Sequence, residues 1–425
     1  MATNLMKSRR SSTPISRFEM SGFPARVLHI ATPADAEREL HLIKVDSGGI
    51  GMMAAKMLTR CVKLTGLQCR QANILKQEML ALGGDAAVAR GTVACSIDKT
   101  DVILIGTDKQ LHTLCCKLAP QPFGLPALST VLQQILTRAA QRPRFWRTAQ
   151  RELSLERPLI MGILNVTPDS FSDGNLYSDP QRAIDRALEM VAEGADIIDI
   201  GGESTRPGAE QVSTEDELKR VIPVITGLAN RTSCSISVDT WKSPVAHAAI
   251  AAGAAIVNDI SGFNFDPRMA AVAARTGAGV VLMHTRGTPQ SMQHDTVYAD
   301  LIGEIIHSLK QSLAMAGEAG IERERIAIDP GIGFGKLAVH NLEILRRLRE
   351  FTSIGLPLLT GTSRKSFIGN VLNREIVQRI YGTAATVALA VHNGADILRV
   401  HDVCEMRDVA DMAHAISTGH TIEPI

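Results

Sequence analysis

The stretch MGILNVTPDSFSDG, residues 161–174, joins an apolar run to a polar loop. The run stops at Asn165, and Thr, Asp, Ser and Gly residues follow it. A short apolar run with such a boundary predicts a buried strand. Two interpretations of its end are open: an ordinary turn, or a strand whose tip delivers a metal or phosphate ligand under a closing loop. The rest of the chain decides between them.

The same pattern, an apolar run followed by a helical segment, recurs eight times from residue 157 to about residue 420. The predicted strands are 158–166, 196–202, 235–240, 254–261, 279–285, 325–331, 357–363 and 396–403. Continuous apolar strands separated by helices predict a parallel sheet that is covered on both faces. Eight such units in roughly 250 residues favour a closed (β/α)₈ TIM barrel over an open sheet. We therefore assign residues 157–420 to a barrel.

The preceding part predicts a smaller α/β domain over residues 21–140. Apolar runs predict strands at 26–32, 40–46 and 100–107, and helical periodicity predicts helices at 51–64, 73–82 and 128–142. A basic stretch, 141–156, is expected to be a linker. Residues 1–20 contain several serines and basic residues but no acid before Glu19, and a disordered tail is favoured over a targeting segment.

Composition excludes several classes of function. The 425 residues carry a formal net charge of +1, which gives no global electrostatic case for nucleic acid or an anionic membrane. No apolar stretch reaches the roughly 18 residues of a membrane helix. The seven cysteines include no C-x-x-C pair, and they fit reduced thiols and a cytoplasmic location. We expect small-molecule substrates.

Polar residues follow nearly every predicted barrel strand. They are Asn165, Glu203, Thr205, Arg206, Asp239, Asn258, His284, Asp329, Lys365, Arg399 and His401. A single polar residue at a strand end is usually a helix cap, but the carboxyl ends of all eight strands meet on the face that carries TIM-barrel active sites. So many polar residues on one rim indicate a binding site.

These residues sort by chemistry. Asp239, Asn258 and Asp329 suit a flat heterocycle that has both donors and acceptors. The positive groups Lys365, Arg399 and Arg206, with His401, suit phosphate or diphosphate oxygens. Asn165 is a hard oxygen ligand of the type that Mg²⁺ accepts while it keeps most of its waters. His284 is interpreted as a rim residue rather than a catalytic one.

Seven segments resemble the dihydropteroate synthase family, in the same order and on the same strands. They are MGILNVTPDSFSDG, GGESTRPGA (201–209), ISVDT, VNDISG, DPGIGFGK (329–336), GTSRKSFIG and LRVHDV. The resemblance covers the whole barrel. It implies condensation of 6-hydroxymethyl-7,8-dihydropterin diphosphate with 4-aminobenzoate, which forms 7,8-dihydropteroate and diphosphate in folate biosynthesis. It also implies Mg²⁺, a homodimer, and a target of sulfonamides.

The resemblance assigns roles to the polar residues. The pterin contacts would be Asp239, Asn258, Asp329 and Lys365, of which Asp239, Asp329 and Lys365 would be catalytic. The diphosphate contacts would be Asn165, Thr205, Arg399 and His401, with Asn165 also holding the metal. The aminobenzoate side would be Thr205, Arg206 and Ser366. Asn175 and Ile332 depart from the common family pattern, and they put loop closure and the edge of the pterin pocket in doubt.

Two rival functions share parts of this pattern. A pterin-binding methyltransferase would use the Asp and Asn contacts but needs no diphosphate site, so TSRKS (362–366) and RVHD (399–402) favour the synthase. A catalytically silent pterin-binding scaffold is disfavoured, because unpaired charges on the rim would bring only repulsion and desolvation cost. The sequence assigns no role to the N-terminal domain.

Overall fold

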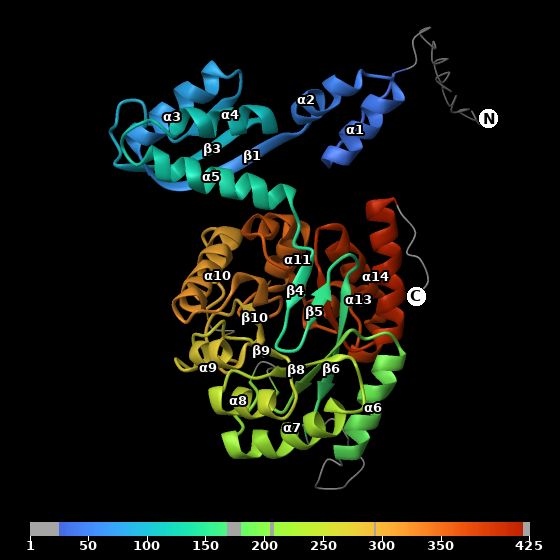
Figure 1. Cartoon of the computed structure of the whole chain (residues 1–425). Coiled ribbons are helices and arrows are strands. Elements are labelled where there is room, and N and C mark those ends of the chain that lie inside the picture. Colours follow the sequence, from blue (N-terminus) through green and yellow to red (C-terminus); the bar gives the residue numbers. More distant parts are fainter. Residues whose placement is uncertain (1–24, 168–179, 205–207, 293–294, 420–425) are drawn as a thin grey trace, which may run out of the picture. The chain divides into compact units, whose positions relative to one another are not determined.

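The computed structural model describes residues 25–167, 180–204, 208–292 and 295–419 (Figure 1). The chain divides into two compact units, Met1–Gln133 and Gln134–Ile425. Among the described helices, none combines the length and the apolar character needed to cross a membrane.

The smaller unit contains a three-stranded antiparallel sheet with the strand order β1-β3-β2. Its elements are α1 (Pro33–Leu42), α2 (Ser47–Met57), β1 (Thr59–Gln68), α3 (Cys69–Ala81), β2 (Asp85–Val88), β3 (Lys99–Thr107), α4 (Asp108–Leu118) and the first part of α5 (Leu125–Ala140). Burial alternates along β3, as expected of a sheet with one covered face.

Two of the strands predicted here are wrong. Residues 26–32 form no strand, and 40–46 include the end of α1. The reason is local: Thr32 caps α1 in a capping box with Asp35, and Pro33 occupies the first turn, so a helix begins at Pro33 and runs into the second predicted strand. The helix predicted at 51–64 ends at Met57, after which β1 begins. The strand at 100–107 and the helix at 128–142 correspond to β3 and α5.

The larger unit is a (β/α)₈ barrel, which confirms the predicted fold class. Its strands are β6 (Leu159–Asn165), β7 (Ile197–Gly201), β8 (Ser235–Asp239), β9 (Ile256–Asp259), β10 (Gly279–Met283), β11 (Ile326–Asp329), β12 (Leu359–Thr360) and β13 (Ile397–Val400). Their order is β11-β10-β9-β8-β7-β6-β13-β12, and a parallel bridge between Ile328 and Leu358 joins the two ends of the sheet.

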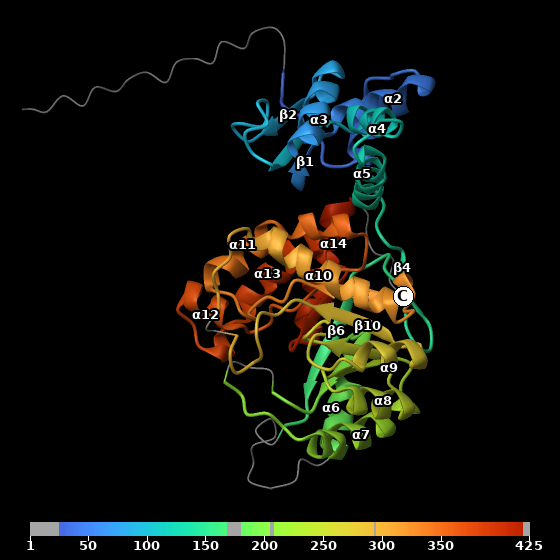
Figure 2. The ribbon, with the colours of Figure 1, turned by 90° about the vertical axis from the view of Figure 1, so that its left-hand side faces the viewer.

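Helices surround the strands of the barrel, as Figure 2 shows for α6 to α9. The helices are α6 (Pro180–Ala192), α7 (Thr214–Ala229), α8 (Ser243–Ala251), α9 (Met269–Thr276), α10 (Leu301–Glu318), α11 (Ala338–Arg346), α12 (Ser366–Leu372), α13 (Ile380–His392) and α14 (Val403–Thr418). Short 3₁₀ turns, η2 (Arg323–Arg325), η3 (Leu348–Ile354) and η4 (Ile376–Gln378), lie between some of them.

The barrel interior has two layers of different character. Side chains alternate between the interior and the helices along each strand. The layer at the amino ends of the strands is apolar and consists of Met161, Ile197, Ile256, Val281, Ala327, Leu359 and Ile397. Further toward the carboxyl ends of the strands the inward positions are mostly polar, and they include Asn165, Asp199, Asp239, Asn258, Asp329 and Arg399. We call these two sets the apolar layer and the polar layer.

The stretch 141–156, expected to be a linker, instead contains an ordered hairpin, β4 (Phe145–Arg147) and β5 (Glu152–Ser154). Trp146 and Leu153 on it are buried against the apolar layer. The Trp146 indole nitrogen donates a hydrogen bond to the carbonyl oxygen of Arg325, at 2.9 Å. The hairpin therefore covers the amino end of the barrel and is part of the larger unit.

Candidate active site

The strand register brings the predicted polar residues to one level of the barrel. Asn165 on β6 lies opposite Gly201 on β7, Gly201 lies opposite Asp239 on β8, and Asp239 lies opposite Asn258 on β9. Asp329 ends β11 opposite Met283. The parallel register therefore places these polar side chains around the carboxyl-end opening of the barrel.

Arg399 joins two carboxylates across the polar layer. Its Nε donates to Asp199 Oδ2 and its Nη2 donates to Asp239 Oδ2, both at 2.6 Å. Asn258 Nδ2 also donates to Asp199 Oδ2, at 3.0 Å. Asp199, which the sequence reading missed, is fully buried and links two of the predicted site residues.

Two carboxylate oxygens in this cluster have no hydrogen-bond partner among the described residues. They are Asp199 Oδ1 and Asp239 Oδ1, and both are buried. Burial raises the pKa of Asp239 to about 7, although Arg399 acts in the opposite direction. A buried acceptor without a partner is costly, so Asp239 Oδ1 is suited to receive an N–H donor from a ligand.

Lys365 and Asp329 form a second charged group. Gly331 N donates to Asp329 Oδ1 at 2.7 Å, and Lys365 Nζ donates to the carbonyl oxygen of Ile332. The Lys365 ammonium also lies 4.8 Å from the centre of the Phe334 ring. Burial lowers the pKa of Lys365 to about 8, and burial raises the pKa of Asp329.

A buried lysine that the sequence reading missed organises the loop after β11. Lys336 Nζ lies 2.9 Å from His284 Nδ1 and donates to the carbonyl oxygens of Gly331 and Phe334, both at 2.9 Å. Burial lowers the pKa of His284 to about 2, so the ring is neutral and accepts this hydrogen bond. His284 is a rim residue, as expected from the sequence, and it supports the loop that follows Asp329.

A second cluster joins Glu203, which the sequence indicated, to Lys242 and Glu217, which it did not. Lys242 Nζ donates to Glu203 Oε2 at 2.8 Å, to Glu217 Oε2 at 2.6 Å and to the carbonyl oxygen of Val212 at 2.6 Å. Burial raises the pKa of Glu217. The cluster ties β7, the start of α7 and the turn after β8 to one another beside the site.

The remaining predicted residues lie at the rim. Asn165 ends β6 and is half-buried, and His401 Nδ1 lies 3.0 Å from Ser363 Oγ. Ser366 is exposed and begins α12. Thr205 and Arg206 lie outside the described residues, as do Asn175 and most of the first predicted closing loop. Ile332 is buried, and its carbonyl oxygen receives Lys365.

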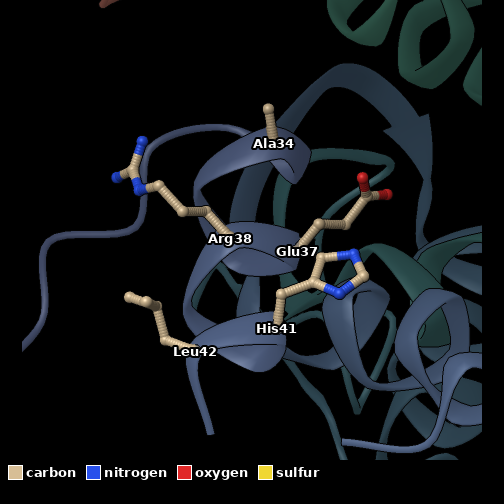
Figure 3. A pocket seen from close by; sticks show the side chains of 5 residues that line it. All are labelled: Ala34, Glu37, Arg38, His41 and Leu42. Carbon is tan, nitrogen blue, oxygen red and sulfur yellow. The ribbon is translucent and has the colours of Figure 1, made fainter. Parts of the chain in front are cut away.

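A depression in the smaller unit lacks such a convergence of polar groups from several strands. A shallow depression beside α1 is lined by Ala34, Glu37, Arg38, His41 and Leu42 (Figure 3). Its side chains come from one helix, and Figure 3 shows Arg38 and Glu37 pointing to different sides of it. Within the described ranges, no group of three or more His, Cys, Asp or Glu residues is arranged to hold a metal. The polar layer is therefore the candidate active site.

Comparison with known proteins identifies the family of the chain. The model of the family described as pterin binding enzyme matches residues 161–401, more than half of the chain. Dihydropteroate synthase of Synechocystis sp. is 50% identical over 262 residues, which are 61% of this chain and 91% of that protein. The solved Xanthomonas albilineans dihydropteroate synthase with 4-aminobenzoic acid is 43% identical with a TM-score of 0.61, and the match covers 64% of this chain and 98% of that one.

A further relative extends beyond the barrel. The probable bifunctional folylpolyglutamate synthase/dihydropteroate synthase of Halobacterium salinarum is 43% identical over 389 residues, which are 92% of this chain. This match is longer than the larger unit and so includes part of the smaller one. The chain spans about half the length of that relative, because only 47% of it is matched. On the family model, these identities and the shared fold, the chain belongs to the pterin-binding enzyme family, in its dihydropteroate synthase branch.

Proposed function

We propose that this chain condenses 6-hydroxymethyl-7,8-dihydropterin diphosphate with 4-aminobenzoate, forming 7,8-dihydropteroate and diphosphate. The observation that carries the proposal is the polar layer, where Asp239, Asn258, Asp329 and Arg399 meet at the mouth of the barrel. This set offers acceptors and a fixed cation to a planar, donor-rich ring that carries an anionic group.

The pterin binds deepest in this proposal. Its amino and ring N–H groups donate to Asp239 Oδ1 and to Asp329, which are buried carboxylates. The nitrogen of Asn258 is engaged by Asp199, so its oxygen is left to accept a third donor from the ring. Lys365 donates to an acceptor atom of the ring after it gives up the carbonyl oxygen of Ile332.

The diphosphate lies nearer the rim, by Asn165, Thr205 and His401, with Arg399 facing it from the polar layer. Glycine at 201 leaves this end of the site open, because a Cβ there would lie 3.8 Å from Asn165 Oδ1 and 3.6 Å from Asp239 Oδ2. A single amide oxygen fits Mg²⁺, which keeps most of its waters and also binds phosphate oxygens. When bound, Mg²⁺ would neutralise negative charge on the leaving diphosphate.

The reaction exchanges one bond at the pterin methylene carbon. The amine nitrogen of 4-aminobenzoate forms a bond to this carbon, the carbon–oxygen bond to diphosphate breaks, and the amine loses a proton. The carboxylates of Asp239 and Asp329 stabilise positive charge that develops on the ring and methylene. The aminobenzoate lies on the side of Ser366, Thr205 and Arg206. The proposal also includes a homodimer. It includes a cytoplasmic location as well, because free thiols are typical of a reducing compartment.

The assay incubates the purified full chain with the pterin diphosphate, 4-aminobenzoate and Mg²⁺. We expect dihydropteroate and diphosphate to appear in equal amounts. A parallel incubation with methyl-tetrahydrofolate and a corrinoid acceptor tests the rival methyltransferase. Methyl transfer without diphosphate release would replace the proposal, and pterin binding with neither reaction would favour the silent scaffold.

A further inference from the structure

We propose that Asp199 is a positioning residue of the pterin site: one buried carboxylate sets the orientation of Asn258 toward the ring and fixes Arg399 beside Asp239. The inference rests on the proposed function for its kinetic consequence, although the orientation itself follows from the contacts alone. No contact between Asp199 and a ligand is needed, since the residue acts through its two neighbours.

The place of Asp199 in β7 is unusual for a charged residue. Ile198 and Ile200 on either side pack outward into the core beneath the helices, while Asp199 points inward and is fully buried. A carboxylate at such a position is unfavourable unless its oxygens are used. Its Oδ2 accepts from both Arg399 Nε and Asn258 Nδ2, so one oxygen joins β13 to β9 across the barrel.

For Asn258, this contact settles which way the amide faces. A side-chain amide carries a donor and an acceptor on opposite branches, and the two orientations have similar shapes. Asp199 is a pure acceptor, so it selects the orientation in which the nitrogen points to β7 and the oxygen is left for the ligand. Without Asp199, both orientations become available, and one of them would meet a ring N–H with another N–H.

For Arg399, the contact fixes the plane of the guanidinium. The Nε of Arg399 donates to Asp199 and its Nη2 donates to Asp239, so two carboxylates fix the plane of the guanidinium. A lysine could not bridge them in this way, because its ammonium lacks the planar fork. Loss of Asp199 would leave Arg399 attached through Asp239 alone, where it would compete with the ligand for that carboxylate.

The experiment measures calorimetric binding of pteroic acid and steady-state kinetics for three variants of the full chain. They are Asp199→Ala, Asp199→Asn and the control Thr360→Val, which removes another buried oxygen without a partner but on an outward-facing barrel position. We expect Asp199→Ala to weaken pteroic acid binding at least 10-fold and to raise the KM of the pterin substrate. Asp199→Asn should recover part of the loss, because its oxygen can still accept, and the control should match the wild type.

A double variant tests whether Asp199 acts through Asn258. If it does, Asp199→Ala adds less to the loss in Asn258→Ala than it causes in the wild type. Fully additive losses would overturn this route. Unchanged binding in both Asp199 variants, with only a lower melting temperature, would overturn the positioning role. An inactive wild type that still binds pteroic acid would reject the proposed function alone, and the binding data would still decide the role of Asp199.

Discussion

At the residue scale, substitutions of Asp239 and Lys365 should lower turnover without lowering the stability of the fold. In Asp239→Asn and Lys365→Ala we expect kcat/KM to fall by about 100-fold or more, the size seen when one electrostatic group is lost from an active site. Arg399 would keep Asp199 as a partner in the first variant, so the melting temperature should change little. Lys219→Ala is a matched control, since its side chain is 71% exposed on α7. Near-normal turnover in either site variant would remove that residue from the mechanism.

The pH dependence should be a narrow bell. Burial raises the pKa of Asp239 to about 7 and lowers that of Lys365 to about 8. The ionised carboxylate is lost as the pH falls below about 7, and the ammonium is lost as the pH rises above about 8, so kcat/KM should decline on both sides. In Lys365→Arg the side chain keeps its charge at high pH. The alkaline limb of the kcat/KM profile should therefore shift to higher pH, while the acid limb stays at the same pH. An alkaline limb that does not move would assign that titration to another group.

At the element scale, the loop after β11 depends on Lys336. Lys336→Met keeps much of the volume but leaves the carbonyl oxygens of Gly331 and Phe334 without their donor. Each buried acceptor left unpaired costs about 1–3 kcal/mol, so the melting temperature should fall. The pterin KM should rise more than the aminobenzoate KM, because Gly331 of this loop donates a hydrogen bond to Asp329. Lys310→Met on the exposed face of α10 serves as the control. Equal changes in both KM values would contradict this division.

The sequence was most informative where a residue and a strand end coincide. Asn165, Asp239 and Asn258 were found because periodicity located the strands, and the parallel register then brings strand ends together. Asp199 was missed because a charged residue inside an apolar run was read as part of the strand alone. The alternation of DIIDIGG (196–202) held the signal, since Asp199 falls on the inward side.

Contacts between distant segments were beyond the sequence. Nothing in the pattern links Lys336 with His284, which are 52 residues apart. The same limit applies to Trp146. Its buried cluster includes residues of the barrel strands and its hydrogen-bond acceptor lies in the turn η2, whereas its own sequence neighbours are basic and typical of a linker. In the smaller unit, the cap at Thr32 outweighed strand-like Leu and Ile residues.

At the scale of the whole molecule, the hairpin decides where the chain can be shortened. A chain that begins at Gln134 retains β4 and β5 and should fold with activity, whereas one that begins at Glu152 loses Trp146. Removal of a large buried aromatic side chain costs about 3–5 kcal/mol, so the shorter chain should melt at a lower temperature, and Trp146→Ala in the full chain should reproduce most of the loss. Thermal unfolding and turnover of all three measure this. A stable, fully active chain from Glu152 would show that the hairpin is dispensable.

The covered amino end of the barrel also affects the order in which the substrates bind. Trp146 and Leu153 close the amino end of the barrel together with the apolar layer. Substrates and products therefore enter and leave through the opening at the carboxyl ends of the strands. In the proposed arrangement the pterin lies deeper than 4-aminobenzoate, since Asp239 and Asn258 are buried while Ser366 is exposed at the rim. The pterin substrate must therefore bind before 4-aminobenzoate, and the pterin end of the product lies deepest when the product is released. Aminobenzoate should therefore bind weakly until pterin and diphosphate are in place, which calorimetric titration with and without them would reveal. A ligand that occupies the rim beside Ser366 would also prevent the release of a pterin bound below it.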